Sequence, residues 1–324
     1  MQPLNKFEKY LIEEFYDDYR EGRMSRRTFI RRVAFITGSM GATITAMTAV
    51  GCRPIELPSP TTPMPTPTAP AAAAPAAQGG AVPGAKSPLS VPEGDPAVKA
   101  SDVTFENGSD KIIAYLTQPA ADGTYAAILV CHENRGLTPH IKDVARRFAK
   151  AGYVALAVDL LSREGGSDKI DMDQRPGLLT KAGIARHVGD FAAGLKYLQT
   201  LNYVDGKRIG MTGYCFGGGV TWASAEAIPD LKAAAPFYGP APDLEKVANI
   251  KAAVLGVYAE LDTRITGGKD ALDKALTAAN ITHKMNVYPG VNHAFHNDTG
   301  DRYVEAQATQ AWNDTLAWFK QYLG

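Results

Sequence analysis

One cysteine of the chain stands between glycines at a place where a strand-like run meets a helix-like run. The sequence Gly-Tyr-Cys-Phe-Gly-Gly at 213–218 ends the apolar run Arg208–Gly213 and opens the helical pattern Gly217–Ala227. Small residues on both sides of a nucleophile are typical of the strained strand-to-helix turn that presents a catalytic side chain, usually a serine. At a helix N-terminus Cys215 would be favoured as a thiolate. The alternative is a glycine-rich turn with a buried structural cysteine.

An acid and a base follow this cysteine along the chain. Asp262 comes just after the apolar run Lys251–Glu260, and His293 comes just after the strand-like Lys284–Tyr288. The order nucleophile, acid, base is typical of one large class of hydrolases. The three residues therefore predict a triad in which Cys215 attacks a carbonyl, His293 exchanges the proton and Asp262 orients the imidazole. Taken singly, each residue has a simpler alternative role: the aspartate as the cap of a turn, and the histidine as a solvated loop residue.

The elements that must position these side chains alternate from Val98 to the C-terminus. Short apolar runs predict strands buried on both faces, and longer segments with a 3.6-residue period predict helices between them. Strand and helix in alternation indicate an α/β fold with a mostly parallel sheet and helices on both faces. The predicted strands also include Tyr125–Glu133, Tyr153–Leu161 and Leu231–Gly239, and the other predicted helices are His140–Ala151, Leu178–Thr200, Gly268–Asn280 and Tyr303–Tyr322.

From about residue 100 onward the chain resembles the dienelactone hydrolase family of the α/β-hydrolase fold. The resemblance rests on the elbow with cysteine, on residues 259–262 around the aspartate and on residues 292–295 around the histidine. It implies one α/β-hydrolase domain over 98–324 that cleaves a small ester or lactone, as carboxymethylenebutenolidases do. It also implies that no metal and no organic cofactor takes part.

The resemblance assigns further roles to a fourth segment of the chain, residues 131–136. It implies that the carboxylate of Glu133 contacts the resting thiol and helps to deprotonate it when substrate arrives. The backbone N–H groups of Asn134 and Phe216 are expected to form the oxyanion hole. The alternative role for Glu133 is an ion pair with Arg135 or Arg186.

At one position the chain departs from the family pattern. Dienelactone hydrolases carry an arginine four residues after the catalytic histidine, where it holds the substrate carboxylate, but this chain has Asn297 there. Arg175 or Arg186 could supply a substitute cation. We therefore expect neutral esters or uncharged lactones to be hydrolysed at least as well as a lactone that bears a free carboxylate.

The N-terminal region has the features of an export signal. The apolar residues within 1–23 are spaced as one face of a short helix, and this segment shows no catalytic pattern. Arg26 and Arg27 then precede an uncharged stretch, 33–51, that is only weakly apolar. Paired arginines before such a stretch predict a twin-arginine signal over 1–51, and so the twin-arginine translocation machinery as a partner during export. The alternative is a membrane-spanning helix.

The stretch that follows is predicted to be a tether. Residues 49–52, ending in Cys52, resemble a bacterial lipoprotein box, so Cys52 is a candidate for lipidation. A lipid on this residue is the only membrane attachment that we expect. Residues 52–97 are rich in Pro, Ala and Thr, with almost no large apolar side chains to bury. These features predict a protein of the periplasm or cell surface.

Charge and cysteine content exclude several classes of protein. Lys+Arg and Asp+Glu number 34 each, so the formal net charge is zero and no basic field would hold nucleic acid. The 3 cysteines show neither disulfide-scaffold nor zinc-site spacing. Two rivals to a dienelactone hydrolase remain: a tethered binding protein that kept the fold without turnover, and a broad carboxylesterase unrelated to dienelactones.

Overall fold

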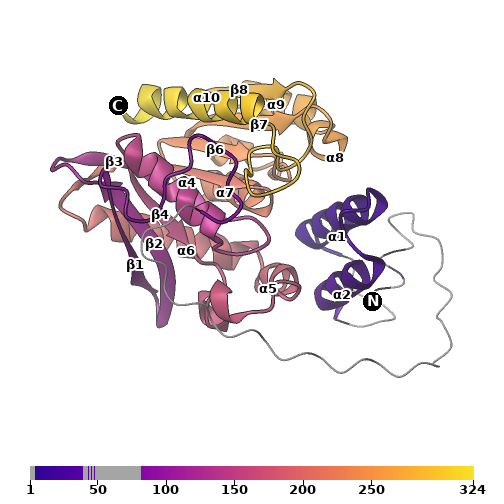
Figure 1. The fold of residues 1–324 in the computed structure, drawn as a ribbon. Coiled ribbons are helices and arrows are strands. Elements are labelled where there is room, and N and C mark those ends of the chain that lie inside the picture. The colour runs from indigo at the N-terminus through magenta and orange to yellow at the C-terminus, as the bar shows by residue number, and fades with distance from the viewer. Residues whose placement is uncertain (1–3, 39–42, 44, 46, 48–81) are drawn as a thin grey trace.

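The computed structural model describes residues 4–38, 43, 45, 47 and 82–324, and its centre is an eight-stranded sheet (Figure 1). The strand order is β1-β2-β4-β3-β5-β6-β7-β8. β1 and β2 form an antiparallel hairpin, β2 pairs antiparallel with β4, and all later pairings are parallel. The strands are β1 (Val98–Asn107), β2 (Asp110–Pro119), β3 (Tyr125–Cys131), β4 (Val154–Val158), β5 (Val204–Tyr214), β6 (Ala233–Phe237), β7 (Ala253–Ala259) and β8 (His283–Tyr288).

Helices cover both faces of the sheet, as the alternating pattern predicts. They are α4 (Pro139–Lys150), α5 (Arg175–Ala182), α6 (Ile184–Gln199), α7 (Phe216–Ala227), α8 (Thr263–Thr266), α9 (Lys269–Ala278) and α10 (Glu305–Leu323), with short 3₁₀ turns η1 (Ser162–Glu164), η2 (Ser167–Lys169) and η3 (Val247–Asn249). On one face Thr117 of β2 donates a hydrogen bond to Ala145 of α4. On the other, Gly194 of α6 lies against Leu129 and Leu156 of β3 and β4. The α/β-hydrolase fold expected from the sequence is confirmed.

Two elements differ from the sequence prediction. Neither strand of the hairpin β1–β2 was predicted: β1 is mostly exposed and has no apolar run, whereas β2 is mostly buried and its apolar residues 112–116 were overlooked. The single helix predicted over Leu178–Thr200 is two helices, α5 and α6, because Gly183 lies between them with φ 80°, a conformation that ends a helix.

Residues 82–97, the last part of the predicted tether, pack against the domain. Val91 is buried, its N–H donates to Asp143 of α4 at 2.6 Å, and its carbonyl accepts from Arg146 at 2.7 Å. The packed domain therefore begins at Val82. Cys52 and the rest of the predicted tether, 52–81, lie outside the described residues.

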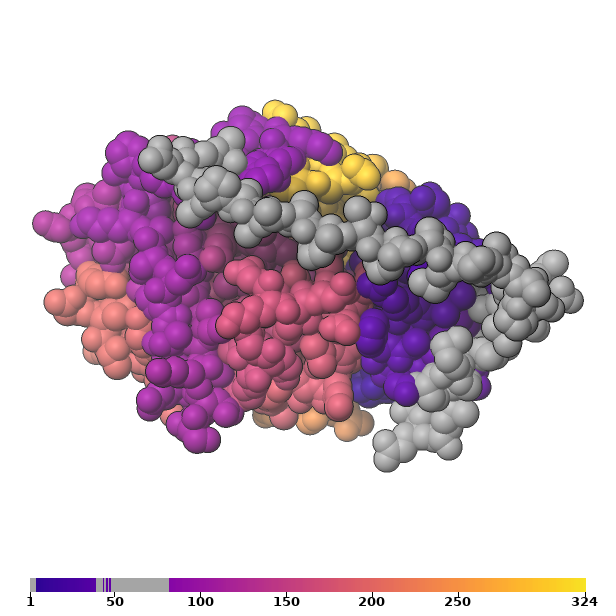
Figure 2. Space-filling model, turned by 60° about the horizontal axis from the view of Figure 1, so that its bottom comes forward, coloured from indigo at the N-terminus to yellow at the C-terminus, as the bar shows by residue number. Residues whose placement is uncertain are grey.

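Two helices precede the domain and pack against it. α1 (Lys6–Arg20) begins with a capping box at Asn5, and α2 (Arg26–Thr37) begins at the N-cap Ser25. In Figure 2 the indigo segment lies flush against the pink segment that contains α5, and both α1 and α2 contact α5. Within the described part of the chain, no helix has both the length and the apolarity needed to cross a membrane.

Candidate active site

Cys215 occupies the strained turn that its glycine neighbours predict. It lies between β5 and α7 with φ 59° and ψ −121°. A Cβ added at Gly213 would lie 2.3 Å from the carbonyl oxygen of Gly217, and one added at Gly217 would lie 2.5 Å from that of His132. Only glycine fits these two positions, because the turn brings backbone atoms into contact on both sides of the cysteine.

His293 and Asp262 form the expected acid and base pair beside this turn. His293 lies in the loop after β8, and its Nδ1 is 2.7 Å from Oδ2 of Asp262, which follows β7. Burial would raise the pKa of Asp262, but His293 and Arg264 hold this pKa below its usual value. The carboxylate of Asp262 can accept a proton carried by Nδ1 and so orients the imidazole, and a ring nitrogen of His293 lies within 4.8 Å of the sulfur of Cys215.

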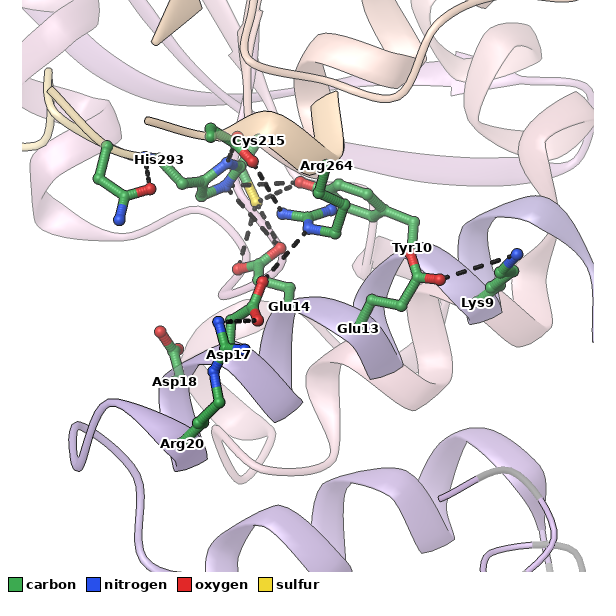
Figure 3. Close-up of polar contacts among 12 residues, drawn as sticks. Lys9, Tyr10, Glu13, Glu14, Asp17, Asp18, Arg20, Cys215, Arg264 and His293 are labelled. Atoms are coloured by element: carbon green, nitrogen blue, oxygen red, sulfur yellow. Dashed lines mark hydrogen bonds and ion pairs between the residues drawn. The ribbon is translucent and has the colours of Figure 1, made fainter. Parts of the chain in front are cut away.

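Two side chains of α1 also reach into this site (Figure 3). The carboxylate of Glu14 lies 3.4 Å from the sulfur of Cys215 and 3.8 Å from Nε2 of His293. The hydroxyl of Tyr10 donates to the sulfur at 3.3 Å and lies 3.5 Å from the same Nε2. The sequence pattern assigns no chemistry to residues 1–23, and apart from the spacing of four residues between Tyr10 and Glu14 it holds no signal for these contacts.

The electrostatics around Cys215 favour the neutral thiol. Burial raises its pKa, and the nearby carboxylates of Glu14 and Glu133 raise it further, while hydrogen bonds from Tyr10 and the backbone of Phe216 act in the opposite direction. The net pKa is well above that of an ordinary cysteine. In this conformation the expected helix-dipole stabilisation of a thiolate is therefore outweighed.

Glu14 itself is held as an anion. Burial would raise the pKa of its carboxyl, but His293, Arg264 and Arg302 attract the charged form and lower the pKa below the usual value. One negative charge is thus fixed against the nucleophile at neutral pH.

Residues of the segment 131–136 line the same site, but their hydrogen-bond partners differ from those expected. Glu133 accepts a hydrogen bond from Nδ2 of Asn297 at 2.8 Å, and Glu14 takes the place beside the thiol that was expected for Glu133. The side chain of Asn134 donates to the other oxygen of Glu14 at 3.1 Å. The oxyanion-hole roles of the Asn134 and Phe216 N–H groups stay predictions.

A cavity of about 320 Å³ opens beside the thiol, between the domain and the N-terminal helices. It is lined by residues that include Cys215, His293, Glu133, Asn297 and Arg302.

The two arginines predicted as substitute cations make their hydrogen bonds with other groups. Arg175 donates to the carbonyls of Ile170 and Arg135, and Arg186 donates to Glu164. The expected preference for uncharged substrates stays a prediction, and Arg302 is a cavity-lining cation that the sequence did not single out.

Three donor atoms in this site also have the chemistry of metal ligands. Among the described residues, the carboxylate of Glu14, the sulfur of Cys215 and a ring nitrogen of His293 come within 4.8 Å of one another. Thiolate, imidazole and carboxylate are the ligands that zinc prefers. The hydrogen bonds of the thiol and the attraction between Glu14 and His293 already account for this arrangement.

A buried charge network holds the loop that carries His293. Asp298 accepts from Arg147 at 2.8 Å and from the N–H of Ser87 at 3.1 Å, and it lies 3.0 Å from Nδ1 of His140. Its side chain is fully buried, and although burial acts to raise its pKa, His140 and Arg147 lower that pKa well below the usual value. The network joins α4, the segment before β1 and the loop after β8 that carries His293.

We expect Asp298→Ala to lower the free energy of unfolding by about 3–5 kcal/mol, because it leaves a buried guanidinium without one of its partners. Urea unfolding at neutral pH measures this loss, and Asp122→Ala, at a fully exposed carboxylate, is the matched control. Because the pKa of Asp298 is lowered in the fold, the stability it provides is present above the pKa of an unfolded aspartate and decreases as the pH falls below it. A loss under about 1 kcal/mol would show that the network is dispensable.

Comparison with known proteins gives the family of this domain. The model of the dienelactone hydrolase family matches residues 112–323, which include the elbow, the aspartate and the histidine. The chain belongs to the dienelactone hydrolase family. It is therefore a hydrolase that acts on ester or lactone bonds.

The relatives match between 69% and 75% of this chain. A protein of Salmonella typhi named for carboxymethylenebutenolidase activity is 35% identical over 259 residues, which are 75% of this chain and 94% of the relative. One of Methylorubrum extorquens with the same name is 34% identical and covers 69% of this chain and 81% of its own length. A solved structure from Klebsiella pneumoniae, named for dienelactone hydrolase, matches with a TM-score of 0.65 at 32% identity, over 70% of this chain and 100% of its own.

Proposed function

We propose that this chain hydrolyses a small ester or lactone, of the kind that carboxymethylenebutenolidases cleave, through the triad Cys215, His293 and Asp262. The observation that carries the proposal is the buried imidazole between an ionised aspartate and the sulfur at the strained turn. A relay of this kind activates a nucleophile and then protonates a leaving group.

The reaction has two halves. The thiol of Cys215 gives its proton to Nε2 of His293 and the sulfur attacks the carbonyl carbon, while the N–H groups of Asn134 and Phe216 stabilise the oxyanion. The C–O bond breaks, His293 returns the proton to the departing alkoxide, and a thioester remains. Water, deprotonated by His293, then attacks the thioester and releases the acid and the thiol.

A colorimetric assay with short-chain nitrophenyl esters tests the proposal. The enzyme to use is the chain from residue 52 to 324, assayed before and after treatment with iodoacetamide. We expect turnover before treatment and its loss in step with carbamidomethylation of Cys215, which mass spectrometry measures. Hydrolysis that survives complete labelling would refute the thiol mechanism, and no hydrolysis of any ester or lactone would favour the binding protein on the same fold.

We also propose that residues 1–51 are a twin-arginine signal and that the domain works outside the cytoplasm, attached through Cys52 when this residue is lipidated. The side chains of Arg26 and Arg27 are exposed on the first turn of α2, where a translocation receptor can reach them. Replacing both by lysine keeps the charge and removes the paired guanidinium groups.

The double substitution Arg26→Lys, Arg27→Lys is expected to leave the precursor in the cytoplasm, and Cys52→Ala to release exported protein into the soluble fraction. Cell fractionation and immunoblotting measure both. Export of the double lysine variant at the normal level would contradict the signal, and membrane retention of the Cys52→Ala protein would favour an anchor helix over 33–51.

A further inference from the structure

The two helices that precede the domain do more than pack beside it, because one of them fills the catalytic site. Tyr10 and Glu14 lie one turn apart on the same face of α1, and both are buried against the nucleophile and the base. None of the elements that form the triad requires them, and the family model matches residues 112–323, which do not include α1 or α2. Their position therefore calls for an explanation of its own.

The carboxylate of Glu14 lies where the acyl group of a substrate or product would have to lie. One of its oxygens is 3.4 Å from the sulfur of Cys215, and the other accepts from the side chain of Asn134, beside the predicted oxyanion hole. A carboxylate in this position resembles the acid product of an ester hydrolase. A substrate carbonyl cannot approach the sulfur while the carboxylate of Glu14 and the hydroxyl of Tyr10 fill the space next to it.

Several contacts on the rim of the site hold α1 there. The guanidinium of Arg264 stacks 4.6 Å from the centre of the Tyr10 ring, Arg302 pairs with Asp18, and Phe7 packs edge-on against Phe216 with ring centres 5.3 Å apart. Lys6 donates to two backbone carbonyls at 241 and 242, beyond the end of β6. Charge and shape complementarity thus extend over the whole length of the helix.

α2 fastens the same segment at a second place. Arg32 pairs with Asp173 at 2.8 Å, and the backbone of Phe35 lies so close to Gly177 of α5 that a Cβ at this glycine would be 2.7 Å from its carbonyl oxygen. Because the helices belong to the same chain, the contact has an effective concentration of the order of mM, which favours occupation over a dilute substrate.

We propose that residues 5–37 are an intramolecular inhibitor of this hydrolase, with Glu14 and Tyr10 occupying the acyl site, and that substrate is turned over only after this segment has left. The proposal rests on the hydrolase function proposed above. The fixed charge of Glu14 adds to the effect, because it disfavours the thiolate that must form for attack.

The test compares the full chain with the chain from residue 52, which retains every packed part of the domain. The Klebsiella structure matches over its whole length and so shows that a domain of this kind folds by itself. We expect kcat/KM for a nitrophenyl ester to be at least about tenfold higher in the shorter chain, a difference of 1.4 kcal/mol in barrier. In the full chain, Tyr10→Ala with Glu14→Ala should recover most of that difference. Glu13→Ala, at a neighbouring side chain that pairs with Lys9, is the matched control and should leave the full chain inhibited.

A second measurement needs no substrate and so separates this proposal from the proposed function. Iodoacetamide should label Cys215 at least about tenfold faster in the shorter chain and in the double variant than in the full chain, with the peptide identified by mass spectrometry. A peptide of residues 5–23 added to the shorter chain should slow labelling, and the same peptide with Glu14→Gln should slow it less.

Equal labelling rates and equal kcat/KM in the full and shorter chains would overturn the proposal. Lower activity in the double variant than in the full chain would overturn it as well. Faster labelling without hydrolysis by any form would support occlusion and refute only the hydrolase function.

Discussion

Replacing Cys215 by alanine is expected to remove ester turnover almost completely, with kcat at least about a thousandfold lower in the chain from residue 52. The reason is that no other group near Nε2 of His293 can form the acyl intermediate: Glu133 is bonded to Asn297, and the side chain of Asn134 is an amide. The fold should persist, because the substitution removes a single sulfur atom. Steady-state kinetics and circular dichroism measure the two outcomes.

Cys215→Ser is the informative companion. A hydroxyl of similar size tests whether the site needs a thiol, since a serine is far harder to ionise where burial already disfavours the charged form of the nucleophile. Only trace activity is expected. Full activity in the alanine variant would show that the turn at 213–218 is structural, which is the alternative that the motif alone leaves open.

The local sequence was sufficient to predict that Cys215, Asp262 and His293 lie close together. The glycines at the elbow are dictated by backbone contacts within a few residues, and Asp262 and His293 each follow a strand whose apolar run is plain in the sequence. Because neighbouring parallel strands end at one edge of the sheet, order along the chain converts directly into proximity in space. Periodicity and spacing therefore carry enough information for this part of the site.

The partners of those residues could not be predicted in the same way. Glu14 and Tyr10 are separated from Cys215 by about two hundred residues, and an ordinary amphipathic helix does not specify the surface on which it docks. The same limit applies to Glu133, whose bond to Asn297 depends on how the loop after β8 packs against the loop after β3. Both cases depend on long-range packing.

Edges and breaks of the fold were hard to predict for a different reason. β1 is held by its pairing with β2 rather than by burial, so it lacks the apolar signal by which the central strands were found. The polar, proline-containing segment at 82–97 reads as a tether, yet it is held by hydrogen bonds to buried charges of α4. Composition measures the capacity to form a core and does not register such contacts.

The second large effect is expected at Asp262. In Asp262→Asn the side chain keeps its size but can present an amide N–H to Nδ1 of His293, so the imidazole proton moves to Nε2 and the histidine can no longer accept the proton of the thiol. A loss of about 10³–10⁴ in kcat follows by analogy with the same change in serine protease triads. Asp270→Asn, at an exposed carboxylate on the neighbouring α9, changes charge by the same amount and should leave kcat unaltered. If Asp262→Asn kept wild-type kcat across neutral pH while Cys215→Ala was inactive, the base would be a group other than the Asp262-oriented His293. Glu133, a buried carboxylate of the domain that lines the cavity beside the thiol, would then be the residue to replace next.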